Sequence, residues 1–196
     1  MSLTNIEEIA TFIVADGKGI LAADESNPTC GKRFDSIGVD STEENRRDYR
    51  ELLFRSKGMK GNIGGVILFD ETIRQKAKDG TLLRDIISDQ GALPGIKVDK
   101  GLQPIEDCPN ETVTVGLDGL DERLKEYSSM GAKFTKWRAV INIGDGIPTD
   151  KCIDANMQAL ADYAKCAQDN GMVPIVEPEV LMDGEHNIDQ CFEATE

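Results

Sequence analysis

The chain has 196 residues, of which 39% are hydrophobic and 30% are charged. This composition is ordinary for a soluble globular protein, and the length suits one domain of about 150–250 residues. The formal net charge of −14 makes nucleic acid and anionic membranes poor partners for the surface as a whole. We therefore expect a single domain over residues 1–196, with no nucleic-acid partner and no membrane partner.

The start of the chain and its cysteines bear on location. The segment MSLTNIEEIATFIVADGKG lacks the basic start and the long apolar core of a signal or transit peptide. No stretch approaches the ~18 consecutive apolar residues of a membrane span. The five cysteines are odd in number and show no CxxC spacing, which is typical of free thiols in a reducing compartment. The sequence therefore predicts a cytoplasmic protein.

The first part of the chain alternates helical and strand-like patterns. Residues 4–16 repeat isoleucines near helical spacing, and Gly17 follows them as a helix cap. An apolar run over residues 19–26 ends in acidic residues and predicts a buried strand. A capping pattern at Ser41 or Thr42 then opens a long helix.

The rest of the chain continues this alternation. In chain order we expect a strand over 63–71, a helix over 72–89, a strand over 94–101, a loop over 102–117, a helix over 118–131, a strand over 133–142, a helix over 151–170, a strand over 172–179 and a helix from 187. A strand–helix unit thus recurs about five times, at roughly 35–45 residues per unit. Alternating units of this kind predict a parallel sheet covered by helices.

The positions of the charged residues distinguish two folds with parallel sheets, the doubly wound sheet and the closed barrel. Each strand-like run carries its charges at its C-terminal end, as Asp24, Lys97 and Glu177 illustrate. Charged groups at the carboxyl ends of many strands are typical of a barrel, whereas a dinucleotide site concentrates on one or two loops. The sequence therefore predicts an α/β fold, a (β/α)8 TIM barrel that is incomplete here, with about five βα units.

Strand alternation places these charged residues on common faces. Residues two apart on a strand share a face, which groups Lys97 with Asp99, Lys136 with Arg138, and Glu177 with Glu179. Together with Asp24 they supply four acids and three bases to one barrel mouth, where the cations offset the burial of the carboxylates. Such a cluster shifts pKa values and supplies proton donors and anion anchors. The alternative is a structural ion-pair network that fills the barrel.

Seven short segments carry a family resemblance when they are taken together. They are GKGILAADES, TEENRR, GGVILFDET, GIKVDKG, GLDGLDER, KWR and VPIVEPE. In this order and spacing they resemble class I fructose-bisphosphate aldolase, a glycolytic lyase that works through a Schiff base. The resemblance implies a (β/α)8 barrel, usually a homotetramer, that cleaves the sugar phosphate fructose 1,6-bisphosphate to dihydroxyacetone phosphate and glyceraldehyde 3-phosphate.

The resemblance also implies roles for nine residues. Four are implied to be catalytic: Asp24 handles protons around carbon–carbon cleavage, Lys136 stabilises charge next to the Schiff base, Glu177 is the general acid and base, and Glu179 positions it. Five are implied to bind substrate: Ser26, Thr29 and Arg33 at one phosphate, Lys97 at a phosphate, and Arg138 beside the catalytic lysine.

The chemistry of aldol cleavage fits these assignments. Cleavage leaves an electron pair on carbon, which the enzyme must stabilise. A zinc ion can do so, but its sites usually need several histidines and the chain has one, His186. A lysine that forms an iminium is the remaining electron sink, so neither a metal nor a separate cofactor is predicted. Its formation needs a carboxyl of moderate pKa, raised by a neighbouring acid.

One expected residue is not among the 196. The family's iminium-forming lysine lies on the sixth strand within EGTLLKPN, and the chain has no such segment. We therefore expect the N-terminal five-eighths of a barrel, with two open sheet edges and an uncovered apolar face. We also expect the isolated chain to lack aldolase turnover. The alternative function is a catalytically dead remnant that acts only as a subunit-interaction module.

Overall fold

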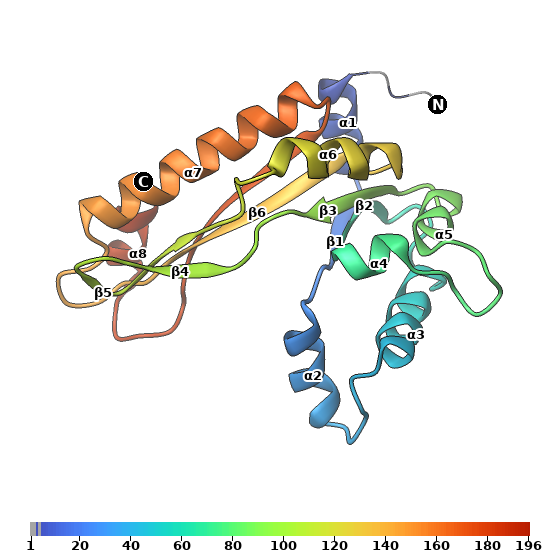
Figure 1. Ribbon diagram of the computed structural model, residues 1–196, viewed down its shortest axis with the longest axis horizontal. Coiled ribbons are helices and arrows are strands. Elements are labelled where there is room, and N and C mark those ends of the chain that lie inside the picture. Colours follow the sequence, from blue (N-terminus) through green and yellow to red (C-terminus); the bar gives the residue numbers. More distant parts are fainter. Residues whose placement is uncertain (1–2, 4) are drawn as a thin grey trace.

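The computed structural model describes residue 3 and residues 5–196. Five parallel strands form one sheet in the order β1-β2-β3-β6-β7, and an antiparallel hairpin pairs β4 with β5 (Figure 1). Their bounds are β1 Gly19–Ala23, β2 Ile63–Leu68, β3 Leu93–Lys97, β4 Leu102–Ile105, β5 Cys108–Thr114, β6 Phe134–Ile141 and β7 Val173–Val180. The parallel sheet with alternating helices confirms the incomplete barrel, with β1 and β7 at its edges in the described part of the chain.

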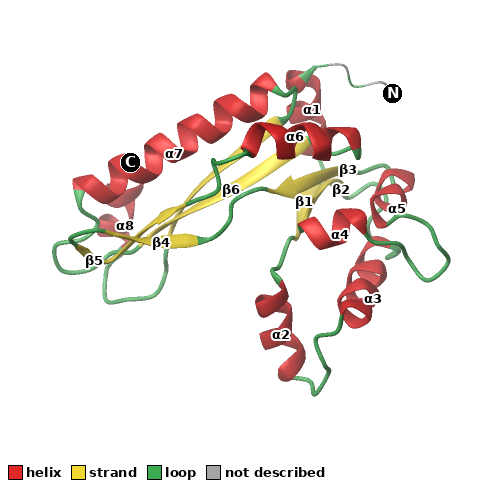
Figure 2. Cartoon of the chain, viewed as in Figure 1, coloured by secondary structure: helices red, strands yellow, loops and turns green. Residues whose placement is uncertain are grey.

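Most of the helices follow strands and cover one face of the sheet (Figure 2). Their bounds are α1 Ile6–Ile13, α2 Asn27–Asp35, α3 Glu43–Phe54, α4 Asp70–Arg74, α5 Leu83–Asp89, α6 Leu120–Ser129, α7 Asp150–Asp169 and α8 Ile188–Thr195. The larger hydrophobic core lies between the sheet and helices α3 to α7. Within it, Trp137 is fully buried and stacks on Tyr163 of α7 at a ring-centroid distance of 5.3 Å. Trp137 therefore serves packing between strand and helix.

A second, smaller core lies on the inner face of the sheet. It joins Ile13 of α1, Ile67 of β2 and Phe134 of β6. Alternation along β6 explains this division, because Phe134 and Trp137 are an odd number of residues apart and point to opposite faces. Lys136 and Arg138 share the inner face with Phe134, as predicted. No helix in the described residues is long and apolar enough to cross a membrane.

Two predicted elements were wrong in their form, and a third element was not predicted. Residues 102–117, expected as a loop, contain the β4–β5 hairpin, whose turn places Asp107 at a positive φ of 63°. The expected helix over 72–89 is two helices, because residues between them form a turn closed by a hydrogen bond from Ala77 N to Thr81 O. Helix α2 was not predicted. Its sequence is polar, but Ser26 caps it and a proline stands in its first turn, which are recognisable start signals.

Strand ends also fall earlier than the sequence suggested. β1 ends at Ala23, β2 at Leu68 and β3 at Lys97, so the acidic residues that follow lie in the connections or at the start of α4. Asp24 and Asp99 are therefore held by loop backbone rather than by the sheet. This makes the contacts of those loops decisive for the geometry of the site.

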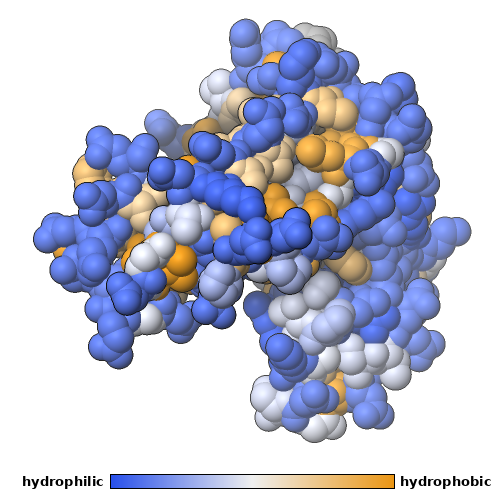
Figure 3. Space-filling view, turned by 60° about the vertical axis from the view of Figure 1, so that its left-hand side comes forward, coloured by the Kyte–Doolittle hydropathy of each residue, from blue (hydrophilic) through white to orange (hydrophobic). Residues whose placement is uncertain are grey.

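Apolar side chains also reach the surface. Orange patches interrupt a largely hydrophilic surface in the view of Figure 3. The well-exposed large apolar residues include four in the last part of the chain: Val176 of β7, Met182, and Ile188 and Phe192 of α8. Helix α8 buries none of its residues. An uncovered apolar surface therefore exists beside the β7 edge, as predicted.

Candidate active site

A pocket of about 1000 Å³ opens where the parallel strands end. All nine residues implied by the resemblance line it: Asp24, Ser26, Thr29, Arg33, Lys97, Lys136, Arg138, Glu177 and Glu179. They come from the ends of β1 and β3, from β6 and β7, and from α2 with its N-cap. The structure thus brings the whole set together, while the individual roles stay predictions.

Lys136 lies at the centre of this cluster. Its Nζ is 3.2 Å from Oδ2 of Asp24 and 3.0 Å from Oε2 of Glu177. The side chains of Lys136 and Asp24 are 11% and 10% exposed, and that of Glu177 is 34% exposed. The loop after β1 and strands β6 and β7, which are distant in sequence, therefore place one ammonium between two carboxylates, which offsets the burial of all three charges.

The charge state of Lys136 follows from this geometry. Burial alone would lower the pKa of Lys136, but the carboxylates of Asp24 and Glu177 outweigh it and raise that pKa above its ordinary value. The amine is therefore an ammonium at neutral pH, and a protonated amine has no lone pair for attack on a carbonyl. Lys136 suits charge stabilisation and proton donation, in agreement with the role implied for it, rather than Schiff-base formation.

Arg138 and Glu179 form a second ion pair beside the first. Nε of Arg138 donates to Oε2 of Glu179, and this bond lowers the pKa of the Glu179 carboxyl below its ordinary value. Glu179 is therefore an anion at neutral pH. It pairs with Arg138 and not with Glu177, so the proposed positioning of Glu177 by Glu179 has no direct contact behind it in this structure.

Lys97 and Asp99 meet at the end of β3. Nζ of Lys97 donates to the Asp99 carboxylate, and the same amine lies 3.4 Å from the Asp99 carbonyl oxygen. Nearby, Arg123 of α6 donates to the carbonyl oxygen of Val98 at 2.9 Å and also to that of Gly116. The loop after β3 is thus tied to α6, and this loop sets the position of the Lys97 ammonium.

The start of α2 forms the wall of the pocket next to β1. Oγ of Ser26 accepts from the backbone N–H of Thr29 at 3.4 Å and lies 3.0 Å from the Thr29 hydroxyl oxygen. Arg33, one helical turn further along, is 58% exposed and forms an ion pair with Glu25. A helix N-terminus with two hydroxyls and a guanidinium suits an anionic group such as a phosphate.

The charges that line the pocket nearly cancel. Besides the nine residues implied by the resemblance, the lining includes four further acids and three further bases: Glu25, Asp70, Asp99, Glu126, Arg74, Lys100 and Arg123. The lining therefore holds seven acidic and seven basic side chains, although the chain as a whole has a net charge of −14. The pocket does not share the strong negative charge of the chain, so an anionic substrate meets little net repulsion there.

Sequence reasoning missed the far rim of this pocket. Arg74 of α4 donates to Asp70 at 2.9 Å and to Glu126 of α6 at 2.6 Å, and Tyr127 donates to the same Asp70 oxygen at 2.9 Å. The spacing of Asp70 and Arg74, four residues apart on a helix, is a signal that pattern reading can find. The contact between Arg74 and Glu126 spans 52 residues and has no local signature.

Comparisons with known proteins agree on one family. Residues 5–196 match the family described as class-I fructose-bisphosphate aldolase. The chain is 57% identical over 196 residues to a probable fructose-bisphosphate aldolase class 1 of Xanthomonas campestris pv. campestris, covering 100% of this chain and 59% of that protein. It is 52% identical over 187 residues to the cytosolic fructose-bisphosphate aldolase 4 of Arabidopsis thaliana, covering 95% and 48%.

A solved structure extends the likeness to the fold. The fructose-bisphosphate aldolase from Plasmodium falciparum, crystallised with TRAP and a small-molecule inhibitor, gives a TM-score of 0.93 at 49% identity. The match covers 95% of this chain and 55% of that chain. The chain therefore spans about half to three-fifths of the length of these relatives.

Proposed function

The chain belongs to the class I fructose-bisphosphate aldolase family, and from this premise we propose that its pocket is part of a glycolytic Schiff-base aldolase site. The proposed reaction is cleavage of fructose 1,6-bisphosphate to dihydroxyacetone phosphate and glyceraldehyde 3-phosphate. One observation carries the proposal: the Lys136 ammonium lies between the Asp24 and Glu177 carboxylates in a pocket lined by all nine implied residues. These groups match the proton transfers and the charge that aldol cleavage requires.

Two steps of the reaction need these side chains. When the family's lysine adds to the substrate ketone, the Glu177 carboxylate, the most exposed of the three groups, takes a proton from the attacking ammonium and returns it to the carbinolamine hydroxyl, which leaves as water. Cleavage of the carbon–carbon bond removes the proton of the adjacent hydroxyl, which Asp24 accepts. In each step the Lys136 ammonium stabilises the ionised form of the carboxyl group that takes part, Glu177 or Asp24. It also stabilises the negative charge that develops on the substrate oxygen.

Binding of the substrate phosphates falls to the cationic groups and to α2. Ser26, Thr29 and Arg33 offer donors at the helix N-terminus for one phosphate, and Lys97, which also lines the pocket, contacts a phosphate in this proposal. Arg138, although paired with Glu179, keeps further N–H donors in its guanidinium. We further propose a homotetramer, as in the family, and a cytoplasmic location, which the name of the Arabidopsis relative supports.

The proposal also covers what the 196-residue polypeptide does alone. The segment TLLKPN, with the lysine that forms the iminium in the family, is not among these residues. We propose that the polypeptide of residues 1–196 has no aldolase turnover by itself and that its groups act with that lysine. The alternative, a dead remnant that only binds other subunits, predicts that these groups never support turnover in any setting.

A chimaera tests the proposal. Residues 1–196 are joined to the part of the Xanthomonas campestris relative that follows the matched region, and cleavage of fructose 1,6-bisphosphate is followed spectrophotometrically. We expect turnover in the chimaera and at least a ~100-fold lower kcat after Lys136→Met, because a cation that stabilises the transition state is lost. Lys165→Met, an exposed change on α7, is the matched control and should retain full activity.

Two results would contradict the proposal. An inactive but folded chimaera would favour the subunit-interaction alternative. A borohydride trap with dihydroxyacetone phosphate that labels a lysine of the 196-residue chain alone would show that the chain needs no further lysine.

A further inference from the structure

Asp24 lies between the end of β1 and the start of α2, and one buried side chain donates hydrogen bonds to the backbone on both sides of it. Arg50 of α3 donates from Nε to the carbonyl oxygen of Ala23 at 3.3 Å and from a terminal nitrogen to that of Glu25 at 2.6 Å. We propose that Arg50 is a positioning residue for the site, which holds Asp24 and the start of α2 in place through these two carbonyls. That Asp24 and α2 belong to a functional site rests on the proposed function, whereas the hydrogen bonds from Arg50 to the backbone do not depend on it.

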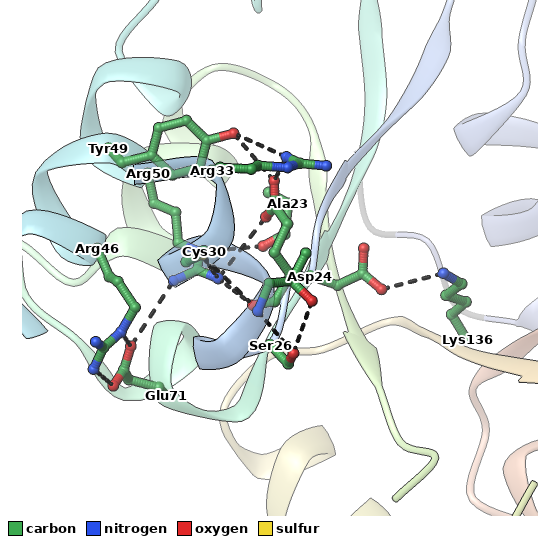
Figure 4. A network of polar contacts seen from close by, with 12 residues as sticks. Ala23, Asp24, Ser26, Cys30, Arg33, Arg46, Tyr49, Arg50, Glu71 and Lys136 are labelled. Atoms are coloured by element: carbon green, nitrogen blue, oxygen red, sulfur yellow. Dashed lines mark hydrogen bonds and ion pairs between the residues drawn. The ribbon is translucent and has the colours of Figure 1, made fainter. Parts of the chain in front are cut away.

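The surroundings of Arg50 leave it little freedom. The residue is fully buried, and its guanidinium lies 3.8 Å from Oε2 of Glu25 and 3.8 Å from Oε1 of Glu71. Arg46, one turn earlier on α3, donates to both Glu71 oxygens at 2.8 and 2.6 Å and so fixes that carboxylate. Figure 4 shows this network between α3 and the end of β1.

The same guanidinium also contacts α2. A terminal nitrogen of Arg50 lies 3.6 Å from Sγ of Cys30, a fully buried residue in the first half of that helix. On the outer side, Tyr49 of α3 donates to the Glu25 carboxylate at 3.1 Å. Helix α3 therefore holds the whole stretch from Ala23 to Cys30, which carries Asp24 on one side and the predicted phosphate-binding residues on the other.

Only an arginine fits this arrangement. The planar guanidinium presents donors in several fixed directions, so a single side chain reaches two carbonyls and two carboxylates. A lysine supplies the charge but concentrates its donors at one atom. Because the carboxylate of Asp24 must lie within hydrogen-bond reach of Lys136, a small shift of its backbone weakens that pair.

Lys136 can report the position of Asp24 without any substrate. The charged groups that face its ammonium are Asp24 and Glu177, with Lys97 opposite it in register on β3. Asp24 is the largest of the charges that raise the pKa of Lys136. A variant that lets Asp24 move away should therefore lower the pKa of Lys136, and this change is separate from a loss of overall stability.

The experiment compares five variants of the ligand-free 196-residue chain with the wild type by NMR titration of the lysine side chains. We expect Arg50→Lys to lower the pKa of Lys136, and Arg50→Met to lower it further. Arg47→Met is the matched control, because Arg47 lies on the same helix and pairs with its neighbour Asp48. In an Asp24→Asn background the Arg50→Lys change should have no further effect on Lys136, since the two act through one contact.

Alkylation of Cys30 gives the second readout, located by mass spectrometry of peptides after treatment with N-ethylmaleimide. We expect the rate of Cys30 alkylation to rise about tenfold in Arg50→Lys. Helix α2 should separate from α3 more often when the contacts of residue 50 are weakened, and this exposes the Cys30 thiol. An unchanged Lys136 pKa in folded Arg50 variants would overturn the proposal. So would failure of both Arg50→Lys and Arg50→Met to fold, which would make Arg50 a residue of the fold alone. Both outcomes leave the aldolase proposal to its own chimaera test.

Discussion

Glu71 is the carboxylate on which the buried arginines of α3 converge. Arg46 binds both of its oxygens, and Arg50 lies 3.8 Å from one of them. The hydrogen bonds from Arg46 lower the pKa of Glu71 below its ordinary value of 4.5, and Asn27 of α2 donates to it as well, at 3.4 Å. Glu71, which was not among the predicted site residues, therefore anchors the wall of the site.

The lowered pKa of Glu71 predicts a pH dependence of stability. Its folded-state pKa lies below the unfolded value, so the contribution is present above about pH 4.5 and is lost as the pH falls through the folded pKa. We expect Glu71→Gln to lower the free energy of unfolding by about 3–5 kcal/mol at pH 7, because two buried guanidinium groups lose their anion.

Urea unfolding at pH 7 and at pH 3 checks this prediction. The difference in the free energy of unfolding between wild type and Glu71→Gln should be smaller at pH 3 than at pH 7. Glu193→Gln, an exposed change on α8, should leave both values unchanged. A gap between wild type and Glu71→Gln that stays constant with pH would show that Glu71 stabilises the fold by packing rather than by charge.

At the scale of elements, a close approach of side chain and backbone holds the inner face of the sheet together. The Phe134 ring of β6 lies close to glycines of β3, the strand next to it, and of β2, one strand further away. A methyl group on Gly95 of β3 would be 2.3 Å from ring carbons of Phe134, and one on Gly65 of β2 would be 2.8 Å away. Glycine at these positions lets one aromatic ring fill the interior below the pocket.

Gly95→Ala tests this packing. We expect it to destabilise the chain by about 1–3 kcal/mol, because the ring must shift within a filled core. Gly31→Ala is the matched control: Gly31 lies in α2, and a methyl group there would meet its nearest atom, Cβ of Ser41, at 3.7 Å. Since alanine favours a helix over glycine, Gly31→Ala should stabilise slightly, by up to about 1 kcal/mol. Thermal unfolding followed by circular dichroism measures both, and equal effects would contradict the packing explanation.

At the scale of the whole molecule, one side of the structure is uncovered. Strands β1 and β7 are the sheet edges in the described part of the chain, and both ends of a parallel sheet present unpaired backbone groups. Beside β7, Val176 is 46% exposed and Phe192 is 64% exposed. Edges and apolar patches of this kind promote association.

We therefore expect the 196-residue chain to self-associate at micromolar concentrations. The double variant Val176→Lys with Phe192→Asp should shift it toward monomer, because charges on an edge strand and its neighbouring helix oppose pairing. Leu52→Lys is the control, since Leu52 is 73% exposed on α3 and remote from β7 in sequence. Sedimentation velocity measures the association. A wild-type chain that stays monomeric would contradict the prediction.

Much of the site was predictable because two regularities act locally along the chain. Strand alternation puts Lys136 with Arg138, and Glu177 with Glu179, on the inner face. Parallel strands then bring their carboxyl ends to one edge of the sheet. The two ion pairs between β6 and β7 are diagonal. In the register Arg138 stands opposite Glu177 and Val140 opposite Glu179, so Lys136 and Arg138 each pair with the carboxylate two residues beyond the residue directly opposite.

Other features had no local signal. The hairpin over residues 102–114 contains prolines and a turn at positive φ, which a strand pattern does not reveal. Arg46 and Arg50 lie on a polar helix, yet both are buried. Their burial depends on carboxylates supplied by β1's loop and by α4, so only the packing of these elements identifies it.

Periodicity and strand direction are properties of the chain alone. The order of the elements, the barrel class and the faces that carry the charged residues could therefore be predicted from the sequence. The tertiary structure decided which charges meet. Lys136 and Asp24 are 112 residues apart, and the hydrogen bonds from Arg50 to the backbone around Asp24 join α3 to the end of β1 and the loop after it. Contacts of this kind depend on where the helices pack on the sheet. That position depends on the packing free energy of the whole core, so it cannot be deduced from any single segment.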